Sequence, residues 1–294
     1  MLKSFINYLK YEKRYSPHTV ISYQNDITSF YNYILDTYSV EDVKKVTHFM
    51  IRSWLVKMMQ DGMSSKTVNR KFSALRSYFI FLKRNGIING NPAKKVIPPK
   101  ISKRLPVTVQ KNDMDKLLDE IVFEENFQGY RNKIIISLLY NTGMRRAELI
   151  NLKDGSFDFI NNSVKVLGKG NKERIIPLTN DVIKLLKEYL EMRDKHFECT
   201  QFDYTIVTDK GKKLYPRFVY DVVKSNLSKV SPVQRRSPHI LRHSIATHLA
   251  DEEVDLNAIK AMLGHASLSA TQIYTHNSVE KLRKAYIKAH PKAK

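Results

Sequence analysis

Apolar residues recur at helical spacing in the first part of the chain. Between residues 66 and 84 they follow one another at intervals of four and three residues, which places them on one side of an amphipathic helix. Ser64 or Ser65 is the expected N-cap of this helix, and Gly86 is its expected end. A second helix is predicted to begin at Ser16 and Pro17. The expected buried positions are Val68, Phe72, Leu75, Phe79 and Leu82 in one helix and Val20, Tyr23, Ile27, Phe30, Tyr31 and Ile34 in the other.

The later part of the chain mixes helical and strand patterns. Residues 132–140 predict a buried helix that ends at the Thr142-Gly143 break. Residues 164–178 predict a β-hairpin with glycines in its turn. Asn180 is the expected cap of the next helix, and further helices are expected to begin near Tyr215, His239, Asp255 and Ser269. We therefore predict a mostly α-helical protein with a small β-sheet.

Residues 90–107 separate these two parts. The segment holds four prolines and five Lys or Arg residues, has no helical period and disfavours a central strand. We predict that it is a linker between a helical domain at residues 1–89 and a larger domain at residues 108–294.

The composition adds a strong positive charge. The 294 residues include 50 Lys and Arg against 29 Asp and Glu, which gives a formal charge of +21 and a pI near 9.8. A hydrophobic content of 42% is enough for one or two cores and excludes a collagenous or disordered chain. Residues 1–107 hold 19 basic and 6 acidic residues (+13), and residues 108–294 hold 31 and 23 (+8). Such a charge attracts polyanions, so nucleic acid is the leading partner.

A membrane surface is the competing partner for a basic chain. The longest apolar run, residues 134–140 with Ser137 inside it, is far too short to span a bilayer. The first residues alternate charged and apolar side chains and do not read as a signal peptide. Cys199 is the single cysteine, so no internal disulfide can form, which fits a reducing compartment. We therefore expect a cytoplasmic protein that does not act at a membrane.

The polar side of the helix at residues 66–84 is a candidate for contacts with phosphates. It combines short hydroxyl side chains with long cationic ones, a mixture that suits phosphate oxygens in a groove. The competing interpretation is an ordinary solvated face. The cationic candidates on this helix are Lys66, Arg70 and Arg84.

Several residues after residue 107 are candidates for chemistry, although each also has an ordinary structural explanation. Arg145 follows a glycine break where a helix is expected to begin, and free backbone N–H groups there favour an anion. Lys169 lies between glycines in the hairpin turn, where the backbone can approach a ligand. His239 and Arg242 are three residues apart and project from one side of a helix. The remaining candidates are His265 and Tyr274.

Two other chemistries are not supported by the spacing. His239, His243 and His248 invite a zinc interpretation, but Arg242 stands between the first two and no Cys pair or nearby carboxylate completes a ligand set. The turn sequence GKGNKER lacks the GxxxxGK[ST] spacing of a nucleotide-binding loop. We therefore expect neither a metal ion nor a nucleotide cofactor.

Taken in order, the candidates resemble the catalytic set of the tyrosine recombinases. The strings TGMR, GKGNKER, HILRH and LGH precede the tyrosine, and SPHTV-SY and TVNRKFSALRSYF extend the similarity to nearly the whole chain. The chain is most similar to the Xer-type site-specific recombinases that resolve chromosome dimers at cell division. The resemblance implies a SAM-like core-binding domain at residues 1–89 and a catalytic domain with a tail helix at residues 108–294. Arg146-Ala147 and the string DGSFDF depart from the common family pattern outside the catalytic set.

The resemblance also implies a reaction at a DNA phosphodiester. Tyr274 would form a 3′-phosphotyrosyl link and release a 5′-hydroxyl, and ATP would not be needed because the bond energy is kept. Positioned cations are the strongest available means of stabilising the charge that grows on the phosphate oxygens. The implied roles are charge stabilisation for Arg145 and Arg242, general acid for Lys169, candidate base for His239, and a hydrogen bond to phosphate for His265.

The partners implied by the resemblance are macromolecular. The two domains would close around double-stranded DNA, with linker residues such as Lys103 and Arg104 along the phosphate backbone. Recombinases of this type act as homo- or heterotetramers with a paralogue on synapsed sites, and a DNA translocase is an expected activator. Three alternatives stay open: an integrase or invertase of a mobile element, a type IB topoisomerase, and a DNA-binding protein that does not cut.

Overall fold

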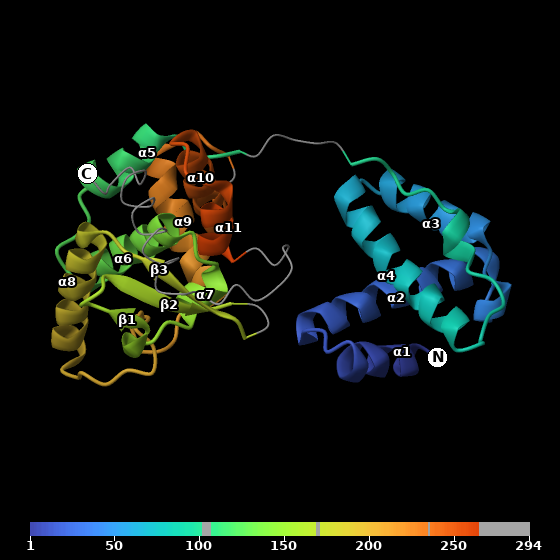
Figure 1. The fold of residues 1–294 in the computed structure, drawn as a ribbon. Helices are drawn as coiled ribbons and strands as arrows, with labels where there is room; N and C mark the ends of the chain where they lie inside the picture. Colours follow the sequence, from blue (N-terminus) through green and yellow to red (C-terminus); the bar gives the residue numbers. More distant parts are fainter. Residues whose placement is uncertain (102–106, 169–170, 235, 265–294) are drawn as a thin grey trace. The chain divides into compact units, whose positions relative to one another are not determined.

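The computed structural model describes residues 1–101, 107–168, 171–234 and 236–264. The chain divides into two compact units, Met1–Arg104 and Leu105–Lys294, and each is described by itself (Figure 1). The division falls inside the predicted linker at residues 90–107.

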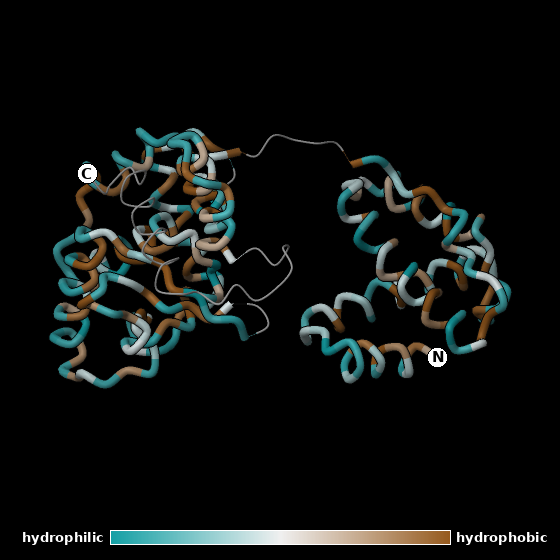
Figure 2. The backbone as a smooth tube through the Cα atoms, in the orientation of Figure 1, coloured by the Kyte–Doolittle hydropathy of each residue, from teal (hydrophilic) through white to brown (hydrophobic). Residues whose placement is uncertain are grey.

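The N-terminal unit is helical. Its helices are α1 (Leu2–Asn7), which continues into a π-helical turn at Tyr8–Glu12, α2 (Pro17–Tyr38), α3 (His48–Gln60) and α4 (Ser65–Arg84). The predicted start signals of α2 and α4 are confirmed, because Ser16 and Ser64 accept hydrogen bonds from the backbone N–H of Thr19 and Thr67. Figure 2 shows hydrophobic and hydrophilic residues alternating along these helices, and the hydrophobic ones form the core of the unit.

The first part of the predicted linker belongs to the N-terminal unit. Residues Pro92–Lys95 form a 3-10 turn that packs against α3 and α4 and buries Ala93 and Val96. The Asn91 side chain caps this turn, and the Asn69 amide on α4 donates to the Pro99 carbonyl at 2.8 Å. The prolines end regular structure here, but small and apolar residues between them still bury surface against the helices.

The C-terminal unit combines helices with a small sheet, as the pattern predicts. The strands β1 (Phe157–Asp158), β2 (Ser163–Leu167) and β3 (Glu173–Pro177) pair in that order, and both pairings are antiparallel. The central helix is α6 (Phe127–Thr142), which is buried along most of its length and packs against α8, α9 and α10. The remaining helices are α5 (Lys111–Asp115, followed by a π-helical turn at Lys116–Glu120), α7 (Arg146–Ile150), α8 (Asn180–Phe197), α9 (Pro216–Val230), α10 (Pro238–Asp251) and α11 (Leu256–Leu263).

Where the structure describes them, the helix ends in this unit follow the expected signals with one exception; the helix start expected near Ser269 lies outside the described residues. Helix α6 ends at Gly143, whose positive φ of 58° lets the chain turn sharply into α7. The predicted cap Asn180 is instead the first residue of α8, and the Thr179 hydroxyl accepts the hydrogen bond from the Val182 N–H. Among the described helices, none is long and apolar enough to cross a bilayer.

Candidate functional site

Three arginines converge on the C-terminus of α11. The last carbonyls of a helix have no intrahelical partner and carry partial negative charge, so cations are favoured there. Each of three successive carbonyls accepts one hydrogen bond from a different arginine. The pairs are Arg174 Nε with Met262 O at 2.8 Å, Arg242 Nη2 with Leu263 O at 2.6 Å, and Arg145 Nη2 with Gly264 O at 3.1 Å.

Arg145 is the N-cap of α7, where the sequence predicts the start of a helix. Its backbone N–H donates to Glu148 Oε2 at 2.7 Å, and its Nη1 donates to Glu148 Oε1 at 2.9 Å. Glu148 therefore orients Arg145. The Arg145 side chain keeps 36% of its surface exposed, so it can contact a ligand from solvent.

Arg242 is the more buried of the two predicted arginines. It lies on α10 and donates to the Gly143 carbonyl at the end of α6 as well as to Leu263. Burial and the nearby positive charge of Arg145 lower the pKa of Arg242 to about 10. The guanidinium therefore remains charged at neutral pH.

Arg174 joins the site although the sequence analysis did not select it. It lies on β3 opposite Val166, and Nη1 and Nη2 donate to the two oxygens of Glu148 at 3.1 and 2.7 Å. Burial raises the pKa of Glu148, but hydrogen bonds from Arg174 and Arg145 outweigh this effect and hold the pKa below its usual value. A signal was present in the sequence, because strand alternation places Arg174 on the same face as the buried Ile176.

His239 lies at the beginning of α10, one helical turn before Arg242. The side chain is exposed, but partial desolvation by the surrounding protein lowers the pKa of its imidazole, and the charges of Arg146, His243, Arg242 and Arg145 lower it further. The ring is therefore neutral at neutral pH, the state in which one nitrogen can accept a proton.

Most of the other predicted residues cannot be placed in the site. Lys169, His265 and Tyr274 lie outside them, as do the linker residues Lys103 and Arg104. The candidate zinc ligand His248 is engaged elsewhere, since Tyr140 and the Val109 carbonyl contact its two nitrogens at 2.9 and 3.0 Å. Within the described residues, no group of three His, Cys, Asp or Glu side chains is arranged to hold a metal ion.

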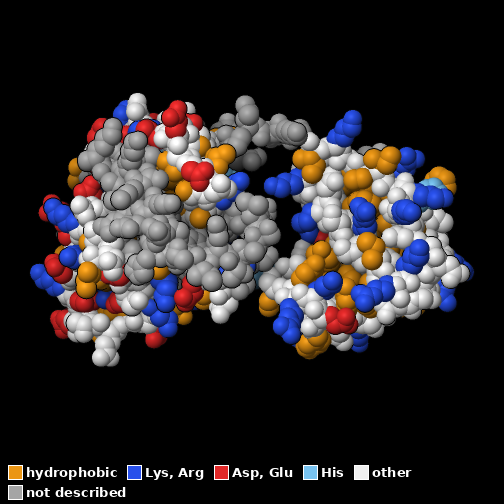
Figure 3. All heavy atoms as spheres, in the orientation of Figure 1, with side chains coloured by type: hydrophobic (Ala, Val, Ile, Leu, Met, Phe, Trp, Pro, Cys, Tyr) orange, Lys and Arg blue, Asp and Glu red, His pale blue; other side chains and the backbone are white. Residues whose placement is uncertain are grey.

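Only some side chains on the predicted phosphate-binding side of α4 are free of contacts within the protein. Lys66 and Arg84 are exposed, but the Arg70 guanidinium forms hydrogen bonds with both carboxylate oxygens of Asp26 on α2. The hydroxyls of Ser73 and Ser77 donate to backbone carbonyls of their own helix. Figure 3 shows many Lys and Arg and few Asp and Glu side chains on the visible face of this unit.

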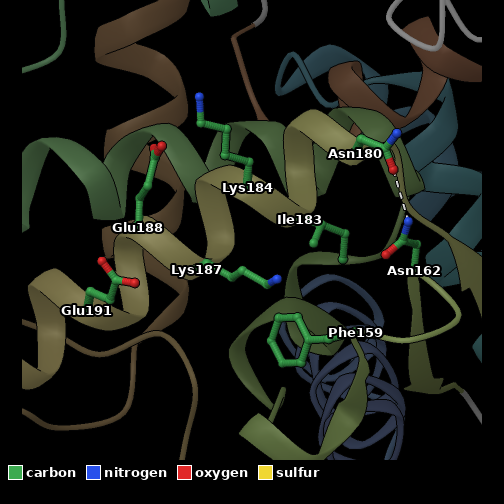
Figure 4. Close-up of a pocket in the computed structure, with 8 residues that line it drawn as sticks. All are labelled: Phe159, Asn162, Asn180, Ile183, Lys184, Lys187, Glu188 and Glu191. Carbon is green, nitrogen blue, oxygen red and sulfur yellow. Dashed lines mark hydrogen bonds between the residues drawn. The ribbon is translucent and has the colours of Figure 1, made fainter.

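A hollow on the outside of the C-terminal unit contains none of these arginines (Figure 4). It lies between α8 and the turn that joins β1 to β2. Asn162 donates to Asn180 at 2.9 Å, and Lys187 lies over the Phe159 ring at 5.8 Å. Its lining mixes lysines and glutamates, so it does not concentrate charge of one sign. Its lining residues are Phe159, Asn162, Asn180, Ile183, Lys184, Lys187, Glu188 and Glu191.

Comparisons with known proteins identify the fold and the family of both units. Residues 2–86 match the N-terminal SAM-like domain of phage integrases, and residues 108–281 match the phage integrase family. The tyrosine recombinase XerC of Oceanobacillus iheyensis is 36% identical over 99% of this chain and 96% of its own length. The XerC of Staphylococcus epidermidis is 37% identical over 99% and 97%.

A solved structure of the XerH site-specific recombinase bound to its difH substrate is similar to the whole chain. It has a TM-score of 0.70 and 26% identity, and the match covers 97% of this chain and 82% of that chain. Both units are therefore accounted for by one group of enzymes. The chain belongs to the phage integrase family and is a tyrosine recombinase.

Proposed function

We propose that this protein is a Xer-type site-specific recombinase that cuts and rejoins DNA through a covalent 3′-phosphotyrosyl intermediate. The observation that carries the proposal is the convergence of Arg145, Arg174 and Arg242 at the end of α11 with a single carboxylate, Glu148, among them. Three positive charges and one negative charge leave a net charge of +2, which favours a phosphodiester. The full-length similarity to XerC proteins supports the Xer assignment over a mobile-element integrase.

The two predicted arginines stabilise the transition state. Negative charge grows on the non-bridging oxygens as the phosphorus is attacked, and donors fixed beforehand stabilise it without reorganising. Arg145 contributes an accessible guanidinium, and Arg242 contributes one that stays charged within the buried site. Each planar fork can donate to two oxygens, which a lysine cannot reproduce.

The remaining residues supply the nucleophile, the two proton transfers and one further hydrogen bond to the phosphate. The Tyr274 oxygen forms a bond to phosphorus while the bond from phosphorus to the 5′-oxygen breaks, so the number of phosphoester bonds is unchanged. His239, kept neutral by partial desolvation and nearby cations, accepts the tyrosine proton, and Lys169 donates a proton to the leaving 5′-oxygen. His265 donates a hydrogen bond to a non-bridging oxygen. Because arginines supply the positive charge, we infer that neither a metal ion nor ATP takes part.

The substrate is double-stranded DNA with a specific recombination site. The XerH structure with its difH substrate supports this choice for a chain of similar fold. The proposal includes a tetramer on two synapsed sites, formed by this chain alone or with a paralogue, and activation by a DNA translocase. It also places the protein in the cytoplasm, where chromosomal DNA is available.

The proposal is tested by trapping the covalent intermediate. Wild type, Tyr274→Phe and the control Tyr220→Phe are incubated with a nicked suicide duplex that carries a Xer-type site, in EDTA and without nucleotide. We expect wild type and Tyr220→Phe to give a covalent protein–DNA adduct on a denaturing gel and Tyr274→Phe to bind the duplex without forming one.

Different failures contradict different parts of the proposal. An adduct with Tyr274→Phe would show that Tyr274 is not the nucleophile. Binding by wild type without any adduct would favour the alternative that the protein binds DNA without cutting it. An adduct that forms only after magnesium or ATP is added would reject the cofactor-independent mechanism but keep the reaction class.

A further inference from the structure

Arg174 is a buried arginine whose whole guanidinium is engaged by the protein. Its side chain is 5% exposed, and each of its three nitrogens donates to a protein acceptor. Nε donates to the Met262 carbonyl on α11, and Nη1 and Nη2 donate to the Glu148 carboxylate on α7. Arg174 therefore joins three separate elements, β3, α7 and α11, through one rigid group.

Two glycines pack directly against this guanidinium. A Cβ added to Gly264 would lie 3.2 Å from Arg174 Nη1 and 3.4 Å from Cζ. A Cβ added to Gly168 would lie 3.3 Å from the same Nη1. These glycines immediately precede His265 and Lys169, two of the proposed catalytic residues. The residue that directly precedes each of these two candidates thus lies against Arg174.

The third connection runs through Glu148. This carboxylate accepts from Arg174 and also from the backbone and side chain of Arg145. A carboxylate held by a two-point fork has a fixed plane, so the direction of its bonds to Arg145 is fixed as well. Arg174 consequently contacts the carboxylate that holds Arg145 and the glycines that precede Lys169 and His265 in the sequence.

We propose that Arg174 is a positioning residue that aligns Arg145, Lys169 and His265 for the cleavage step without itself contacting DNA. The proposal rests on the proposed function of these three residues. Arg174 differs from Arg145 because it has no exposed guanidinium to present to a phosphate, whereas 36% of the Arg145 side chain is exposed.

A lysine at this position tests the alignment. Arg174→Lys keeps the positive charge next to Glu148, but a single ammonium cannot reproduce the planar fork and the bond to Met262 together. Because misplacement of reacting groups by about 1 Å costs about 100-fold in rate, we expect about a 100-fold fall in the rate of adduct formation at saturating DNA. Affinity for the duplex stays within about twofold of wild type, since no DNA contact is removed.

Arg193 provides a matched control. It is an equally buried arginine in the same unit, with a side chain 2% exposed, and it pairs with Asp154 and Asp194 away from the three candidates. Arg193→Lys should lower the melting temperature by a similar amount and leave the cleavage rate near that of wild type. The experiment measures the melting temperature, duplex affinity by gel shift and single-turnover adduct formation for wild type and both variants.

Gly168→Ala is a second, milder variant that keeps the test decisive if Arg174→Lys does not fold. The added methyl group would lie 3.3 Å from both Arg174 Nη1 and the Lys172 carbonyl, so it presses on the guanidinium and on the hairpin turn, and we expect a smaller fall of about tenfold in the same rate. Wild-type cleavage rates in folded Arg174→Lys or Gly168→Ala would overturn the positioning role alone, as would an equal loss in Arg193→Lys. Absence of an adduct with wild type would instead overturn the proposed function, and the positioning role would fall with it.

Discussion

At the scale of single residues, the candidate site uses the free carbonyls of helix ends to hold its cations. Arg242 donates to Gly143 at the end of α6 and to Leu263 at the end of α11. One guanidinium thus satisfies acceptors at the ends of two helices, where carbonyls have no intrahelical partner. A loss of activity on replacing Arg242 therefore has two sources, the missing charge and two disturbed helix ends, whereas the exposed Arg145 reports more directly on contact with a ligand.

Arg146, one of the residues that depart from the common family pattern, lowers the pKa of His239 through its charge. It is the first residue of α7, and its Nη1 donates to the Pro216 carbonyl at 3.2 Å. After partial desolvation, its charge is the largest cause of the lowered pKa of His239. Arg146→Ala should therefore raise the pKa of His239, because a nearby cation no longer disfavours protonation. The acid limb of the pH profile for adduct formation should then move to higher pH.

The measurement combines this profile with titration of the His239 imidazole by NMR. Arg146→Lys keeps a positive charge at the same position and is expected to behave like wild type. A pH profile that does not change in Arg146→Ala, together with an upward shift of the imidazole titration, would show that His239 is not the base.

At the scale of elements, the contact between α6 and α10 contains a neutral histidine. His248 on α10 contacts the Tyr140 hydroxyl of α6 and the Val109 carbonyl. Burial lowers the pKa of His248. The unfolded chain, with a histidine pKa of about 6.5, therefore binds more protons than the folded one as the pH falls. Stability from this group is fully present above about pH 6.5 and is lost as the pH falls toward the lower pKa of the folded state.

His248→Gln should flatten this pH dependence. The variant loses buried hydrogen bonds, so we expect it to be less stable than wild type by about 1–3 kcal/mol at pH 8. The difference in stability should shrink as the pH falls below about 6.5. Only wild type has a histidine at this position that takes up a proton on unfolding, so only wild type loses stability from it. Hydrogen exchange of peptides from α6 and α10 is the suitable measurement, since the single tryptophan, Trp54, lies in the core of the N-terminal unit. A constant difference in stability between pH 5.5 and 8 would contradict this prediction.

Local rules of sequence predict most elements and only part of the site. The start of α4 at Ser64 and the end of α6 at Gly143 depend on hydrogen bonds and backbone angles within a few residues, which the sequence displays directly. Asn180 was wrong as a cap because Thr179, one residue earlier, competes for the same backbone donor. Arg174 was missed because its partners come from two other elements, more than twenty residues away along the chain in both directions.

The same limit applies to the predicted DNA-binding side of α4. Spacing correctly places Arg70 opposite the apolar stripe, but it cannot show that Asp26 of α2 lies within reach. The buried Asp26 carboxylate also pairs with Lys71, so a single acid holds two cations between α2 and α4. Arg70 therefore contributes to the packing of the two helices, and its prediction as a DNA-binding residue remains untested.

At the scale of the whole molecule, the charge of +21 should make the affinity for DNA depend strongly on salt concentration. Binding through phosphates releases counterions, so the logarithm of the affinity falls linearly with the logarithm of the salt concentration, by about 0.9 for each phosphate contacted. We expect a steep negative slope for the full chain, measured with Tyr274→Phe so that no cleavage interferes. An affinity that hardly changes between about 50 and 200 mM salt would contradict binding along the phosphate backbone.

The slope of log affinity against log salt concentration also distinguishes unpaired cations from those that are paired with an acid. Lys66 is exposed on α4, so Lys66→Ala should reduce the slope by about one and weaken binding to all duplexes alike. Arg70→Ala should change the slope less, because Asp26 already balances its charge. The two residues lie one turn apart on the same helix, so both variants meet the same local potential. A larger loss of slope in Arg70→Ala than in Lys66→Ala would mean that DNA displaces Asp26 from the Arg70 guanidinium on binding. The ion pair between α2 and α4 would then be broken in the complex, and Arg70 would bind DNA directly.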